Sequence, residues 1–413
     1  MNKVSRFAPF LLLLVFAAAA ELHVQRAWAE WQWRRAHSSR AAEQSCHFVD
    51  GNPDCWRAAA RLREQEGGDA LPLWLRSLEL DPRNAEAAIA SALPLESAGK
   101  APEAESLLLR GAELNHLWQP RWSLALFYAR QGRRPEFWRW TSEAFDRSYW
   151  DHTAMFRQCS AQGGTAAFLL REILPARLDL RLALLSYQAS QPADGQLRPV
   201  AEAVVECARP DEAGEALPVL VDAIGGLAGS GRPEDAFRVW MSMCRKNLVR
   251  YAAPTVDAPV TNPELRAPFL GSGFDWQAPA ANGISSLVLT GGHGMRFTLT
   301  GSQPRETVLL QQWLFLRGGR TWCLTVDART QGIDSADSAL YWRILDAETS
   351  LPYEADRVPL HGDEWATTRL RYRGPPGDRL VRLALVAACR PGRIRMQGDV
   401  SLRRVELRAE PQP

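Results

Sequence analysis

The feature that most constrains this chain is a helical pattern that recurs at a fixed interval over its first half. Gly99 and Gly231 are separated by 132 residues, which is four steps of 33. Helix pairs of this size do not bury their apolar faces alone, so neighbouring pairs stack and form a continuous core. Between these glycines the consensus weakens, although residues 165–174 and 178–187 keep helical spacing. The pattern predicts an α-solenoid over residues 40–250.

The repeating units resemble tetratricopeptide repeats. The Leu-Asp-Pro turn at residues 80–82 is similar to the close of such a repeat. The next unit has glycine at the inter-helix turn, small residues at two packing positions and leucine at a third: Gly99, Ala104, Gly111 and Leu108. The unit after it continues the pattern with Trp122, Tyr128, Gly132 and Ala144. The resemblance implies a concave groove that receives a peptide or a protein. The alternative is a spacer that holds the C-terminal domain away from a membrane.

Residues 1–35 have the pattern of a signal peptide or a membrane anchor with an amphipathic extension. Lys3 and Arg6 precede an apolar run over residues 7–20. The run is shorter than the about 20 residues that span a bilayer, and it ends in small residues that suit a signal peptidase. Interfacial tryptophans such as Trp31 instead favour an uncleaved anchor in the inner membrane. Both alternatives predict a periplasmic or otherwise extracytoplasmic chain, which is secreted if the signal is cleaved.

Cysteine usage agrees with export from the cytoplasm. Cys46 and Cys55 bracket a short polar loop, and we expect them to form a disulfide in an oxidising compartment. The chain has five further cysteines, whose pairing the sequence leaves open: Cys159, Cys207, Cys244, Cys323 and Cys389.

The periodicity changes after the helical array. Residues 251–261 are rich in proline, which ends helices, and we predict a linker there. From residue 262 to residue 413 apolar residues alternate with polar ones, as in β-strands. Nine candidate strands follow: 286–290, 295–300, 308–316, 321–328, 340–345, 366–372, 380–388, 393–396 and 401–407. Many short strands with Gly, Pro, Asp and Ser turns predict a β-sandwich of the jelly-roll type.

This C-terminal region resembles the carbohydrate-binding-like, galactose-binding-type jelly rolls of bacteria. The resemblance lies in residues 262–265, 273–276, 311–319, 322–329, 339–346, 360–365 and 398–402. The layout of anchor, helical repeats and sandwich is similar to that of membrane-anchored proteins from bacterial exopolysaccharide gene clusters. The resemblance implies recognition of a glycan or of another subunit.

Charge and motifs exclude several classes of function. The 49 Lys and Arg residues nearly balance 47 Asp and Glu residues, so no broad positive field attracts nucleic acid. The sequence has no phosphate-binding loop, no His-Glu-x-x-His and no Gly-x-Ser-x-Gly motif. Its seven histidines do not pair with one another or with cysteine at the spacing of metal ligands. We therefore expect no enzyme activity, no cofactor, no metal and no nucleic-acid partner.

Aromatic residues of the predicted sandwich are the candidates for glycan binding, because sugar rings stack their apolar faces on aromatic planes. In the strand 308–316, one face is uniformly aliphatic apart from one glutamine, and we assign it to the core: Leu310, Gln312, Leu314 and Leu316. The other face then presents Gln311 and Trp313 to solvent. With Trp276 and Arg343, these two residues form the predicted glycan-binding set.

Together these patterns favour a non-enzymatic scaffold or adaptor of the cell envelope that supports exopolysaccharide synthesis or export. The helical groove would bind an envelope protein, and the sandwich would bind a polysaccharide or a subunit. One alternative is an accessory carbohydrate-recognition subunit of a carbohydrate-active enzyme. Another is a pure protein-interaction module without sugar binding.

Overall fold

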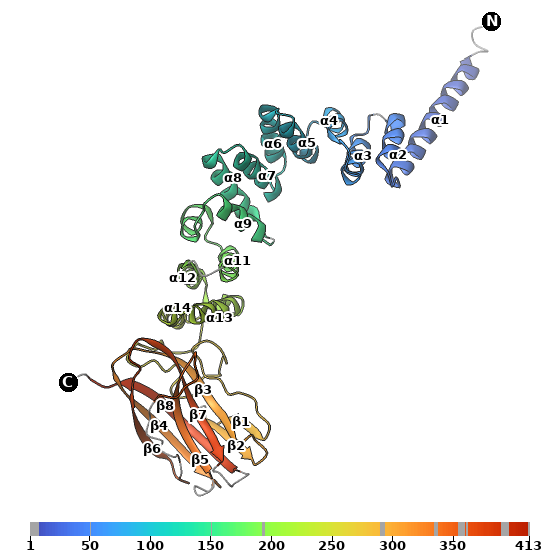
Figure 1. Ribbon diagram of the computed structural model, residues 1–413. Helices are drawn as coiled ribbons and strands as arrows, with labels where there is room; N and C mark the ends of the chain where they lie inside the picture. The colour runs from blue at the N-terminus through green and yellow to red at the C-terminus, as the bar shows by residue number, and fades with distance from the viewer. Residues whose placement is uncertain are drawn as a thin grey trace. The chain divides into compact units, whose positions relative to one another are not determined.

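The computed structural model describes residues 8–411, except for residues 50, 150, 192–194, 290–293, 334–337, 354–359, 361 and 390–395. Within the described residues, fourteen α-helices precede eight β-strands (Figure 1). This order confirms the predicted fold class, a helical array followed by a β-sandwich. The chain divides into two compact units, Met1–Trp150 and Asp151–Pro413. The division does not coincide with the predicted change at residue 251, because the last helices pack against the sandwich.

The first unit consists of helices that pack in successive pairs. They are α1 (Ala8–Arg34), α2 (Ser39–Cys46), α3 (Pro53–Gln65), α4 (Leu71–Leu80), α5 (Ala85–Ser97), α6 (Ala101–Leu114), α7 (Trp118–Arg130) and α8 (Arg134–Arg147). Proline stands in the first turn of α3, α4, α6 and α8, where its missing N–H costs no hydrogen bond. Ala104 and Leu108 are buried between helices. A Cβ on Gly111 would lie 2.8 Å from Ile89 Cγ1, so glycine is needed for this approach.

Glycines in the left-handed conformation end the first helix of the repeat pairs at the predicted turns. Gly99 follows α5 with φ of 77°, and Lys100 N–H donates to Leu95 O at 2.9 Å. In the second unit, Gly231 has φ of 74°, and Arg232 N–H donates to Leu227 O at 2.9 Å. This is the hydrogen-bond pattern of a Schellman cap, which strongly favours glycine.

A disulfide joins α2 to α3. Cys46 and Cys55 are bonded with their Cα atoms 5.6 Å apart, and both side chains are fully buried. Trp56 and Trp74 pack in the same apolar cluster. The remaining five cysteines carry free thiols. The bridge therefore closes the loop before α3 in the small core of the first helices.

The N-terminal helix α1 runs without a break through residues 18–20, the predicted cleavage region. Its exposed apolar side chains include Phe16, Leu22, Val24, Trp28 and Trp31. The basic residues Lys3 and Arg6 lie outside the described residues. No helix in the described part of the chain has the length and apolarity needed to cross a bilayer. The role of residues 1–35 in export or anchoring stays a prediction.

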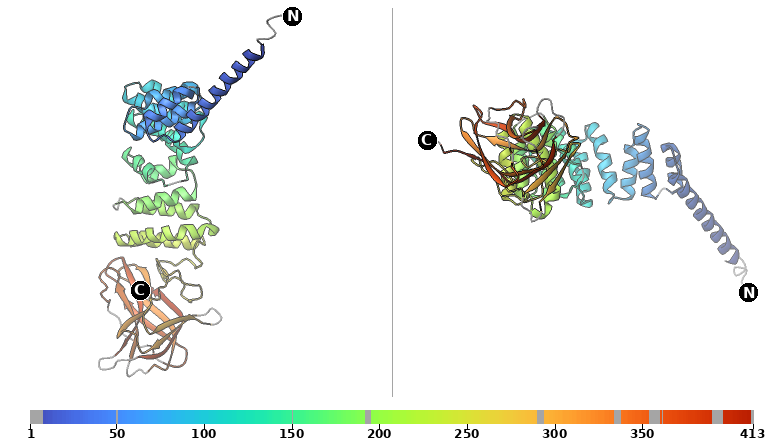
Figure 2. Two further views of the ribbon diagram at one scale, coloured as in Figure 1. Left: turned by 90° about the vertical axis from the view of Figure 1, so that its right-hand side faces the viewer. Right: turned by 90° about the horizontal axis from the view of Figure 1, so that it is seen from below.

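The second unit begins with further helices. They are α9 (Thr153–Ala161), α10 (Ala166–Phe168), α11 (Leu178–Ala189), α12 (Leu197–Cys207), α13 (Ala213–Gly229) and α14 (Pro233–Arg245), with a π-helical turn at Leu169–Ile173 and a 3-10 turn at Pro210–Glu212. The helices α13 and α14 are the yellow-green layer next to the sandwich in Figure 2.

The sandwich contains two antiparallel sheets. The strands are β1 (Ile284–Val288), β2 (Met295–Thr300), β3 (Glu306–Leu316), β4 (Thr321–Gln331), β5 (Ser338–Asp346), β6 (Ala366–Arg373), β7 (Arg379–Cys389) and β8 (Gln397–Ala409). One sheet has the order β1-β2-β8-β4-β6 and the other β3-β7-β5. The ninth predicted strand, 393–396, falls mainly outside the described residues. Alternate residues of β4 are buried, and their side chains meet those of β3, β5 and β7 in one core.

An aromatic seam joins α14 to the sandwich within the second unit. Phe237 of α14 packs against Phe315 of β3 and Phe274, with ring centroids 5.9 Å and 5.3 Å apart. The ring centroids of Trp240 and Phe274 lie 6.3 Å apart. A Cβ on Gly273 would lie 3.0 Å from the Trp240 ring. Phe315 is therefore buried although it points away from the sandwich core, because α14 covers it.

The predicted linker, residues 251–261, runs along this seam. Thr261 is fully buried, and its hydroxyl accepts a hydrogen bond from Trp240 Nε1 at 3.0 Å. The side-chain amide of Gln312 donates to Thr261 O at 2.9 Å and accepts from Thr261 N–H at 3.2 Å. The end of this segment is thus bonded to both α14 and β3.

Candidate functional site at the outer face of the three-stranded sheet

Three of the four predicted glycan-binding residues lie on the outer face of the three-stranded sheet. Gln311 of β3 and Arg343 of β5 both stand opposite Ala384 of β7, so they occupy one cross-strand row. Trp313 stands in the neighbouring row, opposite Arg382. The alternate residues of β3 are fully buried in the core, as predicted: Leu310, Gln312, Leu314 and Leu316. The alternation of the strand therefore presents Gln311 and Trp313 together.

Trp276 has to be removed from the predicted set. Its side chain is fully buried in the sandwich core, where it meets the Trp342 ring edge-on at 6.3 Å. Its indole N–H donates to Asn262 O at 3.1 Å. A ligand has no access to this ring, because the segment before β1 folds it inward.

Gln311 and Arg343 already have partners within the protein. The Gln311 amide donates to Gln277 Oε1 at 3.0 Å, and the two backbones form a β-bridge. Arg343 donates to Glu306 at 2.7 Å, and its guanidinium lies 4.6 Å from the centroid of the Tyr341 ring. These two side chains therefore stabilise the surface around Trp313, and a ligand would have to exchange their contacts.

Trp313 is half-buried and lines a groove of about 520 Å³. One wall is the end of α13 and the start of α14, and the other is formed by the sheet and by the turns after β5 and before β7. The helical wall is built from small residues that include Gly225, Ala228 and Gly229. A Cβ on Gly225 or Gly229 would meet no atom within 4 Å, so these glycines leave the space beside the indole open.

Asp346 fixes the rim of the groove at the end of β5. Its carboxylate accepts hydrogen bonds from the backbone N–H groups of Thr349 and Glu348, at 2.9 Å and 3.1 Å, and from the Tyr353 hydroxyl at 2.8 Å. These bonds, first of all the one from Thr349 N–H, lower the pKa of Asp346 to about 2. The carboxylate is ionised at neutral pH and holds the turn that presents Glu348.

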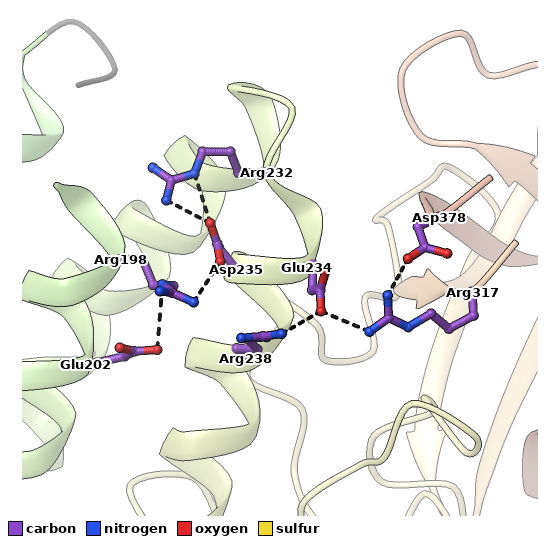
Figure 3. Close-up of polar contacts among 8 residues, drawn as sticks. All are labelled: Arg198, Glu202, Arg232, Glu234, Asp235, Arg238, Arg317 and Asp378. Carbon is purple, nitrogen blue, oxygen red and sulfur yellow. Dashed lines mark hydrogen bonds and ion pairs between the residues drawn. The ribbon is translucent and has the colours of Figure 1, made fainter. Parts of the chain in front are cut away.

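An ion-pair network lies next to the groove and includes Asp378, one of the lining residues (Figure 3). Glu234, in the first turn of α14, accepts from Arg238 at 2.8 Å and from Arg317 at 2.9 Å. Arg317 also pairs with Asp378, which accepts from Gly318 N–H at 2.9 Å. The hydrogen bond from Arg238 lowers the pKa of Glu234, and that from Gly318 lowers the pKa of Asp378. Both carboxylates stay charged at neutral pH.

A second, separate ion-pair cluster ties α14 to α12. Asp235 accepts from Arg232 at 2.7 Å and from Arg198 of α12 at 3.2 Å, and Arg198 also lies 3.9 Å from Glu202 (Figure 3). Partly exposed pairs like these stabilise by only about 0–1 kcal/mol each. Their effect here is geometric, because they fix α14 relative to α12, while the Glu234–Arg317 pair joins α14 to the residue that follows β3.

The groove combines an accessible indole face with charged groups at its rim. Glu348 and Asp378 accept hydrogen bonds, and the exposed Arg379 donates them. This combination suits a ligand with an apolar face and polar edges, such as a sugar ring or a short peptide. Among the described residues, no group of three His, Cys, Asp or Glu side chains is placed to hold a metal ion.

The helical half of this site is not predicted from the sequence. Gly225, Ala228 and Gly229 belong to a repeat helix, and their only signal was a small-residue pattern that also suits helix packing. Gln312 was assigned to the core, but its bonds to Thr261 were not foreseen. A lone amide on an otherwise aliphatic strand face was the available signal, because a buried amide needs hydrogen-bond partners.

Comparison with known proteins gives similarity at the level of structure. No protein-family model matches the chain, and no curated protein matches it in sequence. A CBM4 structure is similar over 37% of this chain and 99% of its own, with 15% identity and a TM-score of 0.29. The CBM22-1 xylan-binding domain of Paenibacillus barcinonensis Xyn10C covers 39% of this chain and 100% of its own, with 11% identity and a TM-score of 0.26. YrrB, a TPR protein with an unusual peptide-binding site, covers 52% of this chain and 95% of its own, with 13% identity and a TM-score of 0.25. At these scores no ligand of these proteins is transferred to this chain.

Proposed function

We propose that this protein is a non-enzymatic adaptor of the bacterial cell envelope. In this proposal the N-terminus tethers it to the inner membrane, the chain lies outside the cytoplasm, and it supports the synthesis or export of an exopolysaccharide. The helical repeats bind an envelope protein, and the sandwich binds a glycan chain. The sequence pattern supports the location, and the groove beside Trp313 supports the glycan-binding part.

The half-buried indole of Trp313 in its groove is the observation that carries the proposal. A pyranose ring stacks its C–H face on an indole, while its hydroxyls need donors and acceptors at the rim. Glu348, Asp378 and Arg379 supply these groups. The volume of about 520 Å³ lies within the range of about 300–1,000 Å³ that small-ligand clefts occupy. The groove therefore suits a short stretch of glycan.

Glycan binding by the full chain and by Trp313→Ala tests this part of the proposal. We expect the wild-type chain to bind on a glycan array, and calorimetry with the bound glycan to show at least a tenfold loss for Trp313→Ala. Tyr149→Ala is the matched control, because Tyr149 is an exposed aromatic residue of the first unit. Unchanged binding by Trp313→Ala would contradict the assignment of this groove. Hydrolysis of the glycan would contradict the non-enzymatic role.

A second cavity supports protein binding by the helical repeats. It lies in the first unit, has a volume of about 310 Å³ and is lined by Ile89, Leu117 and Pro120 among others. Leu117 is 49% exposed, so an apolar side chain of a partner gains buried area there. Leu117→Asp is expected to abolish a cross-link to an envelope protein in intact cells, while Leu351→Asp, an exposed leucine of the sandwich, keeps it. Equal cross-linking by both variants would refute this binding site.

A further inference from the structure

Another cavity lies on the outer face of the five-stranded sheet, on the other side of the sandwich from the Trp313 groove. Its volume is about 650 Å³, and its lining contains an indole, four arginines and two carboxylates, an excess of two positive charges. The arginines are Arg266, Arg329, Arg403 and Arg404. The indole is that of Trp365, which is half-buried.

Strand register brings these arginines together. Asp327 of β4 stands opposite Arg404 of β8, and the next pair is Ala328 opposite Leu402. Arg403 is therefore the extra residue of a β-bulge, and two consecutive arginines line the same cavity. The guanidinium carbon of Arg403 lies 3.9 Å from the centroid of the Trp365 ring, and that of Arg329 lies 5.1 Å from it.

Part of this positive charge has no acidic partner among the residues that the structure describes. Arg266 pairs with Glu264 at 2.9 Å, and Arg404 pairs with Glu406 at 2.7 Å. No carboxylate of the described residues lies within ion-pair distance of Arg329 or Arg403. The Nε atoms of Arg329 and Arg404 are buried without a hydrogen-bond partner. The guanidinium groups of Arg329 and Arg403 therefore keep N–H donors for an anionic ligand at the Trp365 ring.

We propose that this cavity binds a uronate, a sugar that carries a carboxylate, within an anionic polysaccharide. Guanidinium groups match a carboxylate with two parallel hydrogen bonds, and they are weakly hydrated. The two carboxylates of the lining, Asp327 and Glu264, accept hydrogen bonds from sugar hydroxyls. A uronate carries hydroxyl donors beside its carboxylate, whereas an acidic side chain of a peptide does not, so the mixed lining favours a uronate. This site does not depend on glycan binding beside Trp313.

Calorimetry with defined oligosaccharides tests the proposal. The full chain is titrated with oligomers of galacturonate, glucuronate and mannuronate, and with each oligomer after its carboxyl groups are reduced. We expect binding of at least one uronate oligomer and at least tenfold weaker binding of its reduced form. Arg329→Gln and Arg403→Gln should each weaken uronate binding at least tenfold. The control Arg369→Gln removes an exposed arginine of β6 outside the cavity and should change binding less than twofold.

Two further variants separate the possible causes of a loss. Arg403→Lys keeps the charge but not the paired hydrogen bonds, so its affinity should fall between those of wild type and Arg403→Gln, with an unchanged melting temperature. Trp313→Ala should keep uronate binding. The proposal is overturned if the wild-type chain binds none of the three uronates, binds the reduced forms equally well, or loses as much affinity in Arg369→Gln. Equally tight binding of poly-L-glutamate would assign the cavity to an acidic protein instead.

Discussion

Replacing Gln312 with alanine is expected to loosen the attachment of α14 to the sandwich. Gln312 and Thr261 are both fully buried, and the Gln312 amide satisfies the Thr261 carbonyl at 2.9 Å and the Thr261 N–H at 3.2 Å. In the alanine variant these two backbone groups lose their partner, and buried groups left unsatisfied cost about 1–3 kcal/mol each. We therefore expect the free energy of unfolding of the second unit to fall by about 2–6 kcal/mol.

Gln303→Ala is the matched control for this experiment. Gln303 is also buried, donates to Met396 O at 2.6 Å and accepts from Gly301 N–H at 2.9 Å, but its bonds stay inside the sandwich. Both variants should therefore destabilise the sandwich. Only Gln312→Ala should also loosen α14, because Thr261 additionally accepts the hydrogen bond of Trp240.

Urea unfolding and hydrogen exchange measured by mass spectrometry distinguish these effects. We expect α14, Pro233–Arg245, to exchange faster in Gln312→Ala and at the wild-type rate in Gln303→Ala. The reasoning is refuted if α14 exchanges equally in the two variants. It is also refuted if Gln312→Ala lowers the free energy of unfolding by less than about 1 kcal/mol, the net value of one ordinary hydrogen bond.

Three further changes have defined expected outcomes. Gly225→Ala should raise the free energy of unfolding by about 0.5–1 kcal/mol, because the new Cβ meets no atom and alanine is the better helix former; a lower melting temperature would contradict this. Asp346→Asn should lower the free energy of unfolding by about 2 kcal/mol at pH 7, since the pKa of Asp346 is lowered from 3.8 to about 2. That contribution is present above pH 3.8 and is lost as the pH falls toward 2, so urea unfolding of variant and wild type should converge there. Replacing Cys46 and Cys55 by serine should lower the free energy of unfolding by about 2–3 kcal/mol, because the unfolded chain gains the entropy of the opened loop. An unchanged urea midpoint would contradict this.

Features that depend on local chemistry and on periodicity can be read from the amino-acid sequence. Glycine recurs at the repeat turns because the left-handed conformation penalises other residues, so Gly99 and Gly231 marked real helix ends. The alternation of β3 separated its core face from the face that carries Gln311 and Trp313. These signals lie within a few residues of one another, so they are readable before the chain is folded.

Which surfaces are open to a ligand depends instead on how the helices and sheets pack. In the sequence, Trp276 and Trp313 are equally good candidates for glycan binding. In the structure, Trp276 is enclosed by the core, whereas Trp313 lines a groove together with residues of α13. Arg329 and Arg403 meet over Trp365 because of a β-bulge and a strand register that the sequence did not reveal. Burial and charge clustering depend on contacts between residues far apart in the chain. Such contacts are set by the packing of whole helices and sheets, which no local pattern specifies.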